Sequence, residues 1–281
     1  MQYVDFVRQR LTAFADTDTA DATAFVAAEL KRFGFKLKTV NDCMYCDIGR
    51  AKSRIAFYAE LADTYQTTVL LCFAAELAAN AIVGVRLIFD GNTEDEHELV
   101  GEVGELYSAA ICGGVPSDGI GCCYGVAGAG ILEFSLKVIG GKETDVYSSV
   151  GQIAERYAID CTTVGDGQSF VLRYFDKAKI ESALLDIERI AQRYDDENGT
   201  EHALVVSKNY PPIKNDALCV DKVRQSAGDM VTLIRSTECS YAVSRYLDKI
   251  CGCMISVGDG VSSDTVVRLF LRLADTRSIN G

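Results

Sequence analysis

The sequence predicts an α/β fold in which a central, mostly parallel sheet is interrupted by a small ferredoxin-like domain. Strand and helix patterns alternate over 1–130 and again over 211–281, which is typical of an α/β layer. Residues 131–210 instead follow the order β-α-β-β-α-β, which is the split βαβ arrangement. We therefore expect a discontinuous α/β domain of 1–130 plus 211–281, and an inserted ferredoxin-like domain of 131–210.

Two helices and three short strands are expected at the start of the chain. Residues 19–33 fit a helix because Val26, Leu30 and Phe33 recur at spacings of four and three, as they do on one helix face. A further helix is expected over 2–14. Short apolar runs predict strands at 35–40, 44–48 and 54–61.

The next segment of the chain predicts a helix, a strand and a second helix. Residues 67–81 are apolar nearly all round a helix, so that helix should be buried on more than one side. The continuous apolar run at 85–89 predicts a strand buried on both faces of a parallel sheet. Thr93 and Glu96 have the spacing of a capping box, which predicts a helix over 93–111.

The clearest element of the inserted domain is a helix over 177–195, because its apolar residues lie on one stripe. A Gly-Asp-Gly turn at 165–167 predicts a hairpin between strands at 161–164 and 169–175. The other expected elements are strands at 131–139 and 202–207 and a helix at 146–157.

A stiff linker, Tyr210-Pro211-Pro212, leads back to the main domain. Alternating helix and strand patterns then resume. The expected elements are helices at 216–228, 241–250 and 264–274 and strands at 230–235 and 253–257.

The composition argues against several classes of function. With 28 Lys plus Arg against 40 Asp plus Glu, the 281-residue chain has a formal charge of −12, so it should repel the phosphates of a nucleic acid. The chain has two histidines, His97 and His202, which excludes a metal site built from three or more histidines of one chain. Glycines and Pro116 interrupt the apolar stretch 106–132, so we expect no membrane-spanning helix.

The chain has eleven cysteines, and their pattern does not predict a disulfide framework. Their number is odd, and the first ten residues carry charges with no apolar run after them, which does not fit a secretory signal. We therefore expect reduced thiols in a cytoplasmic protein. Cys43 and Cys46 have the spacing of half a zinc site, but a strand would place them on opposite faces.

Five phrases of the sequence have a characteristic order and spacing. They are Val85-Arg-Leu-Ile-Phe89, Phe134-Ser-Leu-Lys-Val-Ile-Gly-Gly141, Val171-Leu-Arg-Tyr-Phe-Asp176, Tyr210-Pro-Pro-Ile-Lys-Asn-Asp216 and Ser244-Arg-Tyr-Leu-Asp-Lys-Ile-Cys-Gly-Cys-Met254. Together they resemble the dinuclear-zinc amidohydrolase and metallopeptidase family of aminoacylases and carboxypeptidase G, above all its N-acyl-amino-acid amidohydrolases. The resemblance implies a catalytic α/β domain interrupted by a ferredoxin-like lid, and a homodimer formed through residues 131–210.

The chemistry that this resemblance implies needs two zinc ions that share a bridging water. A glutamate takes the proton of that water while the metals polarise the amide carbonyl. The resemblance places the acidic pair of the family after the strand at 85–89, where Glu94 is the best match and thus the candidate catalytic remnant. The simpler explanation of Glu94-Asp95-Glu96 is a solvated helix start, where acidic side chains favour the helix dipole.

Other residues occupy the positions that the resemblance assigns to the remaining zinc ligands. The loop at 62–66 contains neither Cys nor His, and Cys122-Cys123-Tyr124 stands where a histidine is expected. The other such positions carry Thr144, Tyr241-Ala242 and Ser262-Ser263. We therefore expect the two-zinc site to be lost and no cofactor to be bound.

The first hypothesis is a catalytically inactive or strongly altered relative of these hydrolases. It would bind a peptide-like or acyl-amino-acid ligand, or act as a partner subunit. Arg173, on an expected strand of the inserted domain, is the candidate group for binding a carboxylate of the ligand. An ion pair of Arg173 with Asp176 or another neighbouring acid explains it equally well.

Two further hypotheses keep catalysis. One is an active metal-dependent amidohydrolase or peptidase whose zinc site is rebuilt from Asp63, Glu94, Asp95 and the Cys122-Cys123 pair, Cys123 above all. These groups would then lie within about 4–5 Å of a common point, because zinc–ligand distances are about 2 Å. The other is a thiol enzyme, which requires an exposed cysteine of low pKa.

Overall fold

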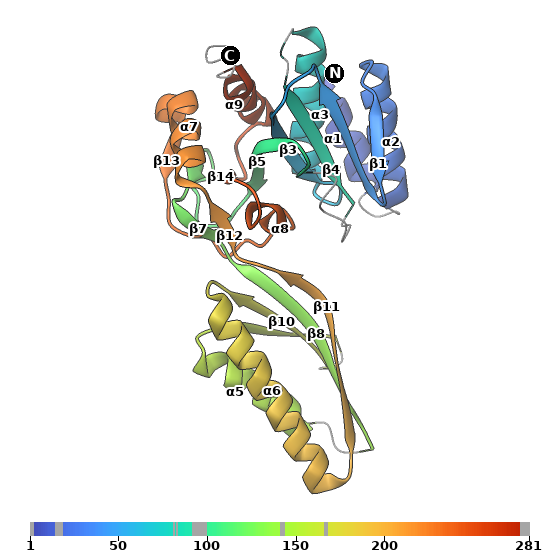
Figure 1. Ribbon diagram of the computed structural model, residues 1–281, viewed down its shortest axis with the longest axis vertical. Coiled ribbons are helices and arrows are strands. Elements are labelled where there is room, and N and C mark those ends of the chain that lie inside the picture. Colours follow the sequence, from blue (N-terminus) through green and yellow to red (C-terminus); the bar gives the residue numbers. More distant parts are fainter. Residues whose placement is uncertain are drawn as a thin grey trace. The chain divides into compact units, whose positions relative to one another are not determined.

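The computed structural model describes residues 3–14, 19–80, 82, 84–91, 100–140, 144–165 and 168–275. The chain divides into two compact units, both drawn in Figure 1. The first unit comprises Met1–Ala127, Lys214–Thr237 and Arg245–Gly281, and the second comprises Gly128–Ile213 and Glu238–Ser244.

The first unit is built on a mixed eight-stranded sheet of order β1-β2-β4-β3-β5-β14-β6-β13. Its strands are β1 (Leu37–Val40), β2 (Cys43–Ile48), β3 (Arg54–Glu60), β4 (Val85–Asp90), β5 (Val103–Ile111), β6 (Ile120–Cys122), β13 (Val231–Leu233) and β14 (Gly252–Val257). The central strands β4, β3, β5 and β14 run parallel, while β1, β2 and the β14–β6 pair are antiparallel. The prediction of an α/β fold with a mostly parallel sheet is confirmed.

Helices of the first unit share one hydrophobic core with one face of this sheet. They are α1 (Tyr3–Phe14), α2 (Thr19–Arg32), α3 (Thr64–Ala79), α7 (Ala217–Ala227) and α9 (Ser263–Asp275). Figure 1 shows α1, α2 and α3 on the same side of strands β1 to β4. The ring of Phe57 in β3 lies 4.6 Å from that of Phe73 in α3 and 4.7 Å from that of Phe270 in α9.

Because side chains alternate along a strand, the next residue of β3, Tyr58, points to the opposite face of the sheet. There its ring lies 5.2 Å from that of Tyr246, which belongs to the short helix α8 (Ser244–Leu247). Both tyrosines are buried. The face that the long helices do not cover therefore also contains packed side chains.

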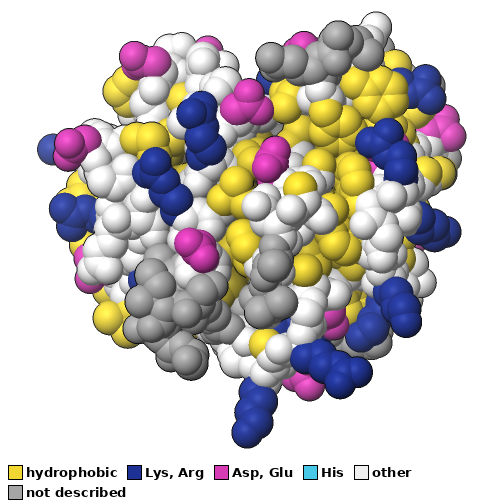
Figure 2. Space-filling view, turned by 90° about the horizontal axis from the view of Figure 1, so that it is seen from above, with side chains coloured by type: hydrophobic (Ala, Val, Ile, Leu, Met, Phe, Trp, Pro, Cys, Tyr) yellow, Lys and Arg dark blue, Asp and Glu magenta, His cyan; other side chains and the backbone are white. Residues whose placement is uncertain are grey.

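Aromatic rings line the outer helices of this unit. Tyr3, Phe6, Phe14 and Phe25 form a linked row on α1 and α2, with ring centroids 6.0–6.4 Å apart between neighbours, and each is only partly buried. The space-filling view from above shows that hydrophobic side chains gather in one broad area of that face, with Lys and Arg side chains at its margin (Figure 2).

The second unit follows the order β8-α5-β9-β10-α6-β11, and its antiparallel sheet has the strand order β11-β8-β10-β9. Its elements are β8 (Gly130–Ile139), α5 (Thr144–Arg156), β9 (Asp160–Val164), β10 (Ser169–Tyr174), α6 (Lys177–Asn198) and β11 (Glu201–Tyr210). Both helices pack on this sheet in a second hydrophobic core. A separate two-stranded sheet pairs β7 (Gly125–Gly128) with β12 (Ile213–Asn215).

Two sequence predictions are wrong. The helix expected over 93–111 is a strand, β5, over 103–111, while residues 92–99 lie outside the described ranges. Strand β5 is a central strand, so residues 106–110 are buried without alternation and do not show the period of a strand with one buried face. The helix expected over 241–250 is limited to one turn, α8, in the described structure.

Among the helices of the described ranges, none is both long enough and apolar enough to cross a membrane.

Candidate functional site

The carboxyl end of the parallel strands is where open α/β sheets usually bind ligands. In this chain Asp90 ends β4 at that edge, and its side chain has a relative exposure of 0%. A buried carboxylate requires hydrogen bonds and a compensating charge. The groups around Asp90 therefore define the candidate site.

Four side chains bind the Asp90 carboxylate. The Tyr58 hydroxyl donates to Oδ2 over 2.6 Å, and the Tyr246 hydroxyl donates to the same oxygen over 3.0 Å. The Cys43 thiol donates to Oδ1 over 2.8 Å. The Arg245 guanidinium lies 3.4 Å from Oδ2 and supplies a positive charge.

The strand register explains why these groups meet. Met44 of β2 pairs with Phe89 of β4, so the preceding Cys43 lies beside Asp90 at the end of the ladder. Tyr58 belongs to β3, which is the other neighbour of β4. Its side chain points to the same face of the sheet as that of Asp90. Arg245 and Tyr246 come from α8, about 155 positions further along the chain.

Both phenols are held in the neutral form. Burial, followed by the charge of Asp90, raises the pKa of Tyr58 and that of Tyr246 well above the ordinary value. Each hydroxyl therefore remains a hydrogen-bond donor at neutral pH. Among the described residues, the site brings together one buried carboxylate, one guanidinium and three uncharged hydrogen-bond donors.

This arrangement does not fit the two-zinc centre that the sequence resemblance implies. The described side chains that bind Asp90 are two phenols, a thiol and a guanidinium, with no imidazole and no second carboxylate among them, whereas a two-zinc centre is held mainly by imidazoles and carboxylates. Among the described residues, no three His, Cys, Asp or Glu side chains are grouped so that they could hold a metal ion. Glu94 and Asp95 lie outside the described residues, as does His97.

Asp63, a candidate ligand of the rebuilt zinc site, is the N-cap of α3. Its carboxylate accepts hydrogen bonds from the backbone N–H of Gln66 over 3.0 Å and from the Gln66 side chain over 3.2 Å. Burial raises the pKa of Asp63, and the hydrogen bonds from Gln66 oppose that rise. Helix capping accounts for this residue.

Of the candidate cysteine pair, Cys122 is buried in the core of the first unit, and Cys123 has its thiol 3.3 Å from the carbonyl oxygen of Tyr124 and 3.5 Å from that of Val126. Burial raises its pKa. The two thiols of the Cys43-x-x-Cys46 motif separate as expected, because Cys43 binds Asp90 while Cys46 belongs to the helix-side core.

Arg173, the candidate ligand-binding residue, pairs with Asp160 across β10 and β9 at 3.7 Å. Both partners are well exposed, with relative side-chain exposures of 38% and 65%. His202 lies in the same unit and contacts the carboxylate of Asp195, with 2.5 Å between Nδ1 and Oδ2.

Most of the thiols are held in the protonated form by burial. All eleven cysteines are free. Burial raises the pKa of several of them, to about 11 for Cys122 and to about 12 for Cys46, Cys72 and Cys219. Cys251 alone among the eleven is exposed.

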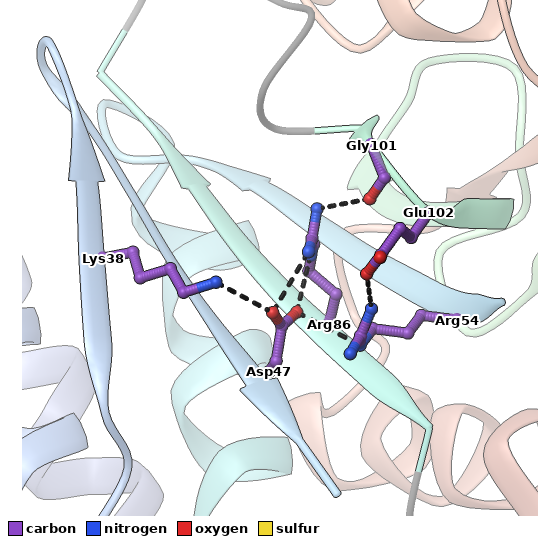
Figure 3. Close-up of polar contacts among 6 residues, drawn as sticks. All are labelled: Lys38, Asp47, Arg54, Arg86, Gly101 and Glu102. Carbon is purple, nitrogen blue, oxygen red and sulfur yellow. Dashed lines mark hydrogen bonds and ion pairs between the residues drawn. The ribbon is translucent and has the colours of Figure 1, made fainter. Parts of the chain in front are cut away.

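A second polar cluster, which the sequence analysis missed, surrounds Asp47 of β2 (Figure 3). The Arg86 guanidinium binds both oxygens of Asp47, over 2.7 and 3.1 Å, and Arg54 and Lys38 each lie 3.4 Å away. Arg54 also pairs with Glu102. Arg54 and Arg86 are buried, so these ion pairs compensate charges that would otherwise be costly.

Sequence reasoning missed the site at Asp90 because its members come from distant positions. Cys43, Tyr58, Asp90 and Arg245 have no common spacing, and only the sheet topology unites them. One signal was present: Asp90 is a carboxylate at the end of the apolar run that was expected to be a buried parallel strand.

No family model and no curated protein matches the chain by sequence. Solved structures do match its fold. The aminobenzoyl-glutamate utilization protein from Klebsiella pneumoniae has a TM-score of 0.73 at 14% identity, over 96% of this chain and 95% of that one. A hydantoinase/carbamoylase family amidase from Burkholderia vietnamiensis has a TM-score of 0.71 at 13% identity, over 98% of this chain and 96% of that one.

A dinuclear metal binding peptidase of the M20 family from Bacillus subtilis matches with a TM-score of 0.68 at 14% identity, over 97% of this chain and 99% of the peptidase. At such identities the likeness concerns the fold. The chain therefore has, along its whole length, the fold of the dinuclear-metal peptidases and amidohydrolases.

Proposed function

We propose that this chain is a ligand-binding relative of the dinuclear-metal amidohydrolases and does not use their two-zinc chemistry. The observation that carries the proposal is the environment of Asp90, whose oxygens are bound by two tyrosines, a thiol and the Arg245 guanidinium. A two-metal mechanism needs carboxylates and imidazoles that are free to bind metal and to orient water. The groups at this edge of the sheet bind one another instead.

The ligand class that we propose is a peptide-like or N-acylated amino acid. The fold is shared with proteins described as an aminobenzoyl-glutamate utilization protein and as hydantoinase/carbamoylase amidases, and an amide next to a carboxylate is the chemistry common to such molecules. Arg173 is our candidate for binding that carboxylate. Its ion pair with Asp160 is solvent-exposed, and such pairs contribute little and exchange easily for another anion.

Metal analysis and ligand binding on the purified full-length chain test this proposal together. Elemental analysis, before and after exposure to zinc, should find no stoichiometric metal. Isothermal titration with a panel of N-acetyl amino acids and dipeptides should detect binding in the wild type. Arg173→Met should weaken that binding at least tenfold, while Arg189→Met, an exposed arginine of α6 that pairs with Asp186, should leave it unchanged.

Two outcomes would contradict the proposal. Bound zinc together with hydrolysis of the same panel would support the rebuilt metal site of Asp63, Glu94, Asp95 and Cys123. The absence of binding across the panel would leave a partner subunit as the remaining hypothesis, and capture experiments with the intact protein would then replace ligand screens.

We also propose that the second unit is a ferredoxin-like lid that pairs with a second copy of the chain. Its strand order supports the first part. For the second, β11 is an edge strand, and Val205 and Val206 on it are 58% and 45% exposed. Light scattering should report a dimer that Val205→Lys converts to a monomer, whereas a monomeric wild type would refute the pairing.

The eleven free thiols support a reducing, cytoplasmic environment, which we propose for this chain.

A further inference from the structure

The outer edge of the eight-stranded sheet at β1, the β1 edge, carries an excess of positive charge in an acidic chain. Residues 31–54, from the end of α2 to the start of β3, contain seven Lys and Arg and two Asp, so their net charge is +5. The whole chain has a charge of −12. We infer that the β1 edge is a docking surface for an acidic, extended segment of a partner protein, which joins the sheet beside β1.

The backbone of β1 is open to a further strand. Among the described residues, β1 is the first strand of its sheet and pairs with β2 alone. The register places Val40 opposite Cys43 across a two-residue turn, and the residues that flank such a turn bond to each other. Because bonding alternates along an antiparallel pair, the backbone of Lys38 also faces β2, while Leu37 and Thr39 direct their N–H and C=O groups outward.

The two faces of the β1 edge select the side chains of the partner. Lys36, just before β1, and Lys38 have the spacing of one strand face, and both are exposed. Lys38 lies on the face opposite the helices, where its ammonium is 3.4 Å from Asp47 (Figure 3). On the other face, Leu37 packs against the helix-side core. A segment in which acidic and apolar residues alternate therefore matches both faces.

The positive charges of this region are available to a partner. The Lys38 side chain is 57% exposed, and the Arg86 guanidinium binds both oxygens of Asp47, so the Lys38 ammonium can turn to another carboxylate at little cost. Three further cations are exposed and form no ion pair with an acidic side chain of the described ranges: Lys36, Arg50 and Lys52. The last two belong to the loop that leaves β2 beside the start of β1. Figure 2 shows several Lys and Arg side chains along the side of the unit where α2 and β1 lie in Figure 1.

The same features decide between possible occupants. Lysines on a sheet edge oppose pairing with a like edge, because β1 of a second copy would bring lysine against lysine. A nucleic acid would be repelled by the acidic remainder of the chain, and it has no peptide backbone to extend the sheet. An acidic peptide in the extended conformation satisfies both the charges and the outward backbone groups.

Peptide binding to the full-length chain, followed by fluorescence anisotropy, tests the inference. The labelled probe is Glu-Val-Glu-Val-Glu-Val-Glu, in which acidic and apolar residues alternate. We expect it to bind and to slow amide hydrogen exchange at Leu37 and Thr39. The block peptide Glu-Glu-Glu-Glu-Val-Val-Val has the same charge without the alternation, and it should bind about tenfold more weakly.

Two pairs of variants separate the charge from the backbone. Lys36→Glu should weaken binding about tenfold, while Lys137→Glu, at an exposed lysine of β8 in the second unit, makes the same change in total charge and should leave binding unchanged. Thr39→Pro removes an outward N–H at an edge, where proline is tolerated, and should also weaken binding about tenfold. Thr39→Val keeps that N–H and should bind as the wild type does.

Several results would overturn the inference. They are no binding of the alternating peptide, equal binding of the block peptide, and binding by Lys36→Glu equal to that of Lys137→Glu. Tighter binding of single-stranded oligodeoxythymidine than of the peptide would assign the charge to a nucleic acid instead. None of these measurements depends on the folding of Thr39→Pro, and none involves Arg173 or zinc, so the outcome is independent of the proposed function.

Discussion

The carboxylate of Asp47 is the shared partner of three cations, because Arg86, Arg54 and Lys38 all form ion pairs with it. Burial alone would raise the pKa of Asp47, but the hydrogen bonds and charges of these three cations hold it below the ordinary value. The carboxylate is therefore more stable in the folded protein than in the unfolded chain. The ion pairs of Asp47 therefore stabilise the folded state, and protonation of the carboxylate at low pH removes that stabilisation.

Asp47→Asn should lower the free energy of unfolding by about 3 kcal/mol, since it leaves two buried arginines without their shared anion. Urea unfolding at pH 7 measures this. The exposed Asp160 provides the comparison, and Asp160→Asn should cost about 0.5 kcal/mol or less. A cost for Asp47→Asn no larger than that of Asp160→Asn would show that the arginines are balanced in another way.

The pH dependence of this effect has a definite sign. A carboxylate whose folded pKa is depressed stabilises the fold fully above its unfolded pKa of about 3.9, and that stabilisation is lost as the pH falls through the folded pKa. The difference in stability between the wild type and Asp47→Asn should therefore be constant near neutral pH and shrink below about pH 4. A difference that instead grew on acidification would contradict the depressed pKa.

At the scale of elements, the loops after β5 and β14 are held together by glycines. The backbone N–H of Gly258 donates to Gly119 and that of Gly260 donates to Ser117. A Cβ on Gly258 would lie 2.0 Å from the carbonyl oxygen of Pro116. The approach of these two loops thus leaves no room for a side chain at that position.

Gly258→Ala should destabilise the protein by about 3 kcal/mol, because one loop must move away from the other. Gly113→Ala, in the same pair of loops, would place its Cβ with nothing within 4 Å and should change stability by about 0.5 kcal/mol or less. Differential scanning calorimetry compares them, and equal transition temperatures for the two variants would refute the close approach.

Helices and strands with a periodic hydrophobic pattern could be predicted from the sequence. Strands that owe their place to the surrounding sheet could not. Helix α6 follows its apolar stripe and is capped by Asp176 and Gly199, as local rules require. Strand β5 was mistaken for a helix because burial on both faces removes the alternation that identifies a strand. Short strands such as β6, which has three residues, carry too few residues for any periodic signal.

At the scale of the whole molecule, the distribution of thiols follows the core. Most of the eleven cysteines are buried or partly buried, and Cys251 is exposed. Burial raises the pKa of Cys46, Cys72, Cys122 and Cys219, which suppresses the reactive thiolate. The cysteines thus serve mainly as small apolar side chains.

Titration of the native protein with a disulfide reagent should show one fast thiol, and Cys251→Ser should abolish that fast phase. The buried thiols should react only on the timescale of unfolding. Cys161→Ser is the control, because Cys161 is partly buried and its pKa is raised by burial. A fast phase that survives Cys251→Ser would reveal an activated thiol and revive the thiol-enzyme hypothesis.

The overall architecture could be predicted from the sequence because the hydrophobic periodicity of a segment identifies the helix or strand that the segment forms. The candidate site at Asp90 could not be predicted in this way. Asp90 was overlooked beside Glu94, since its partners Tyr58 and Arg245 come close only after the sheet has formed. Ion pairs over long sequence distances leave no local pattern, so the Asp47 cluster was missed for the same reason.

The place of β14 in the sheet has a consequence for protein synthesis. Strand β14 comes near the end of the chain, yet it lies between β5 and β6. Until the ribosome has released it, the nascent sheet consists of two separate pieces with unpaired inner edges. Such edges invite association with other chains. Strand β14 thus joins the two pieces into one sheet, and until it is in place their inner edges are the surfaces by which the chain can aggregate.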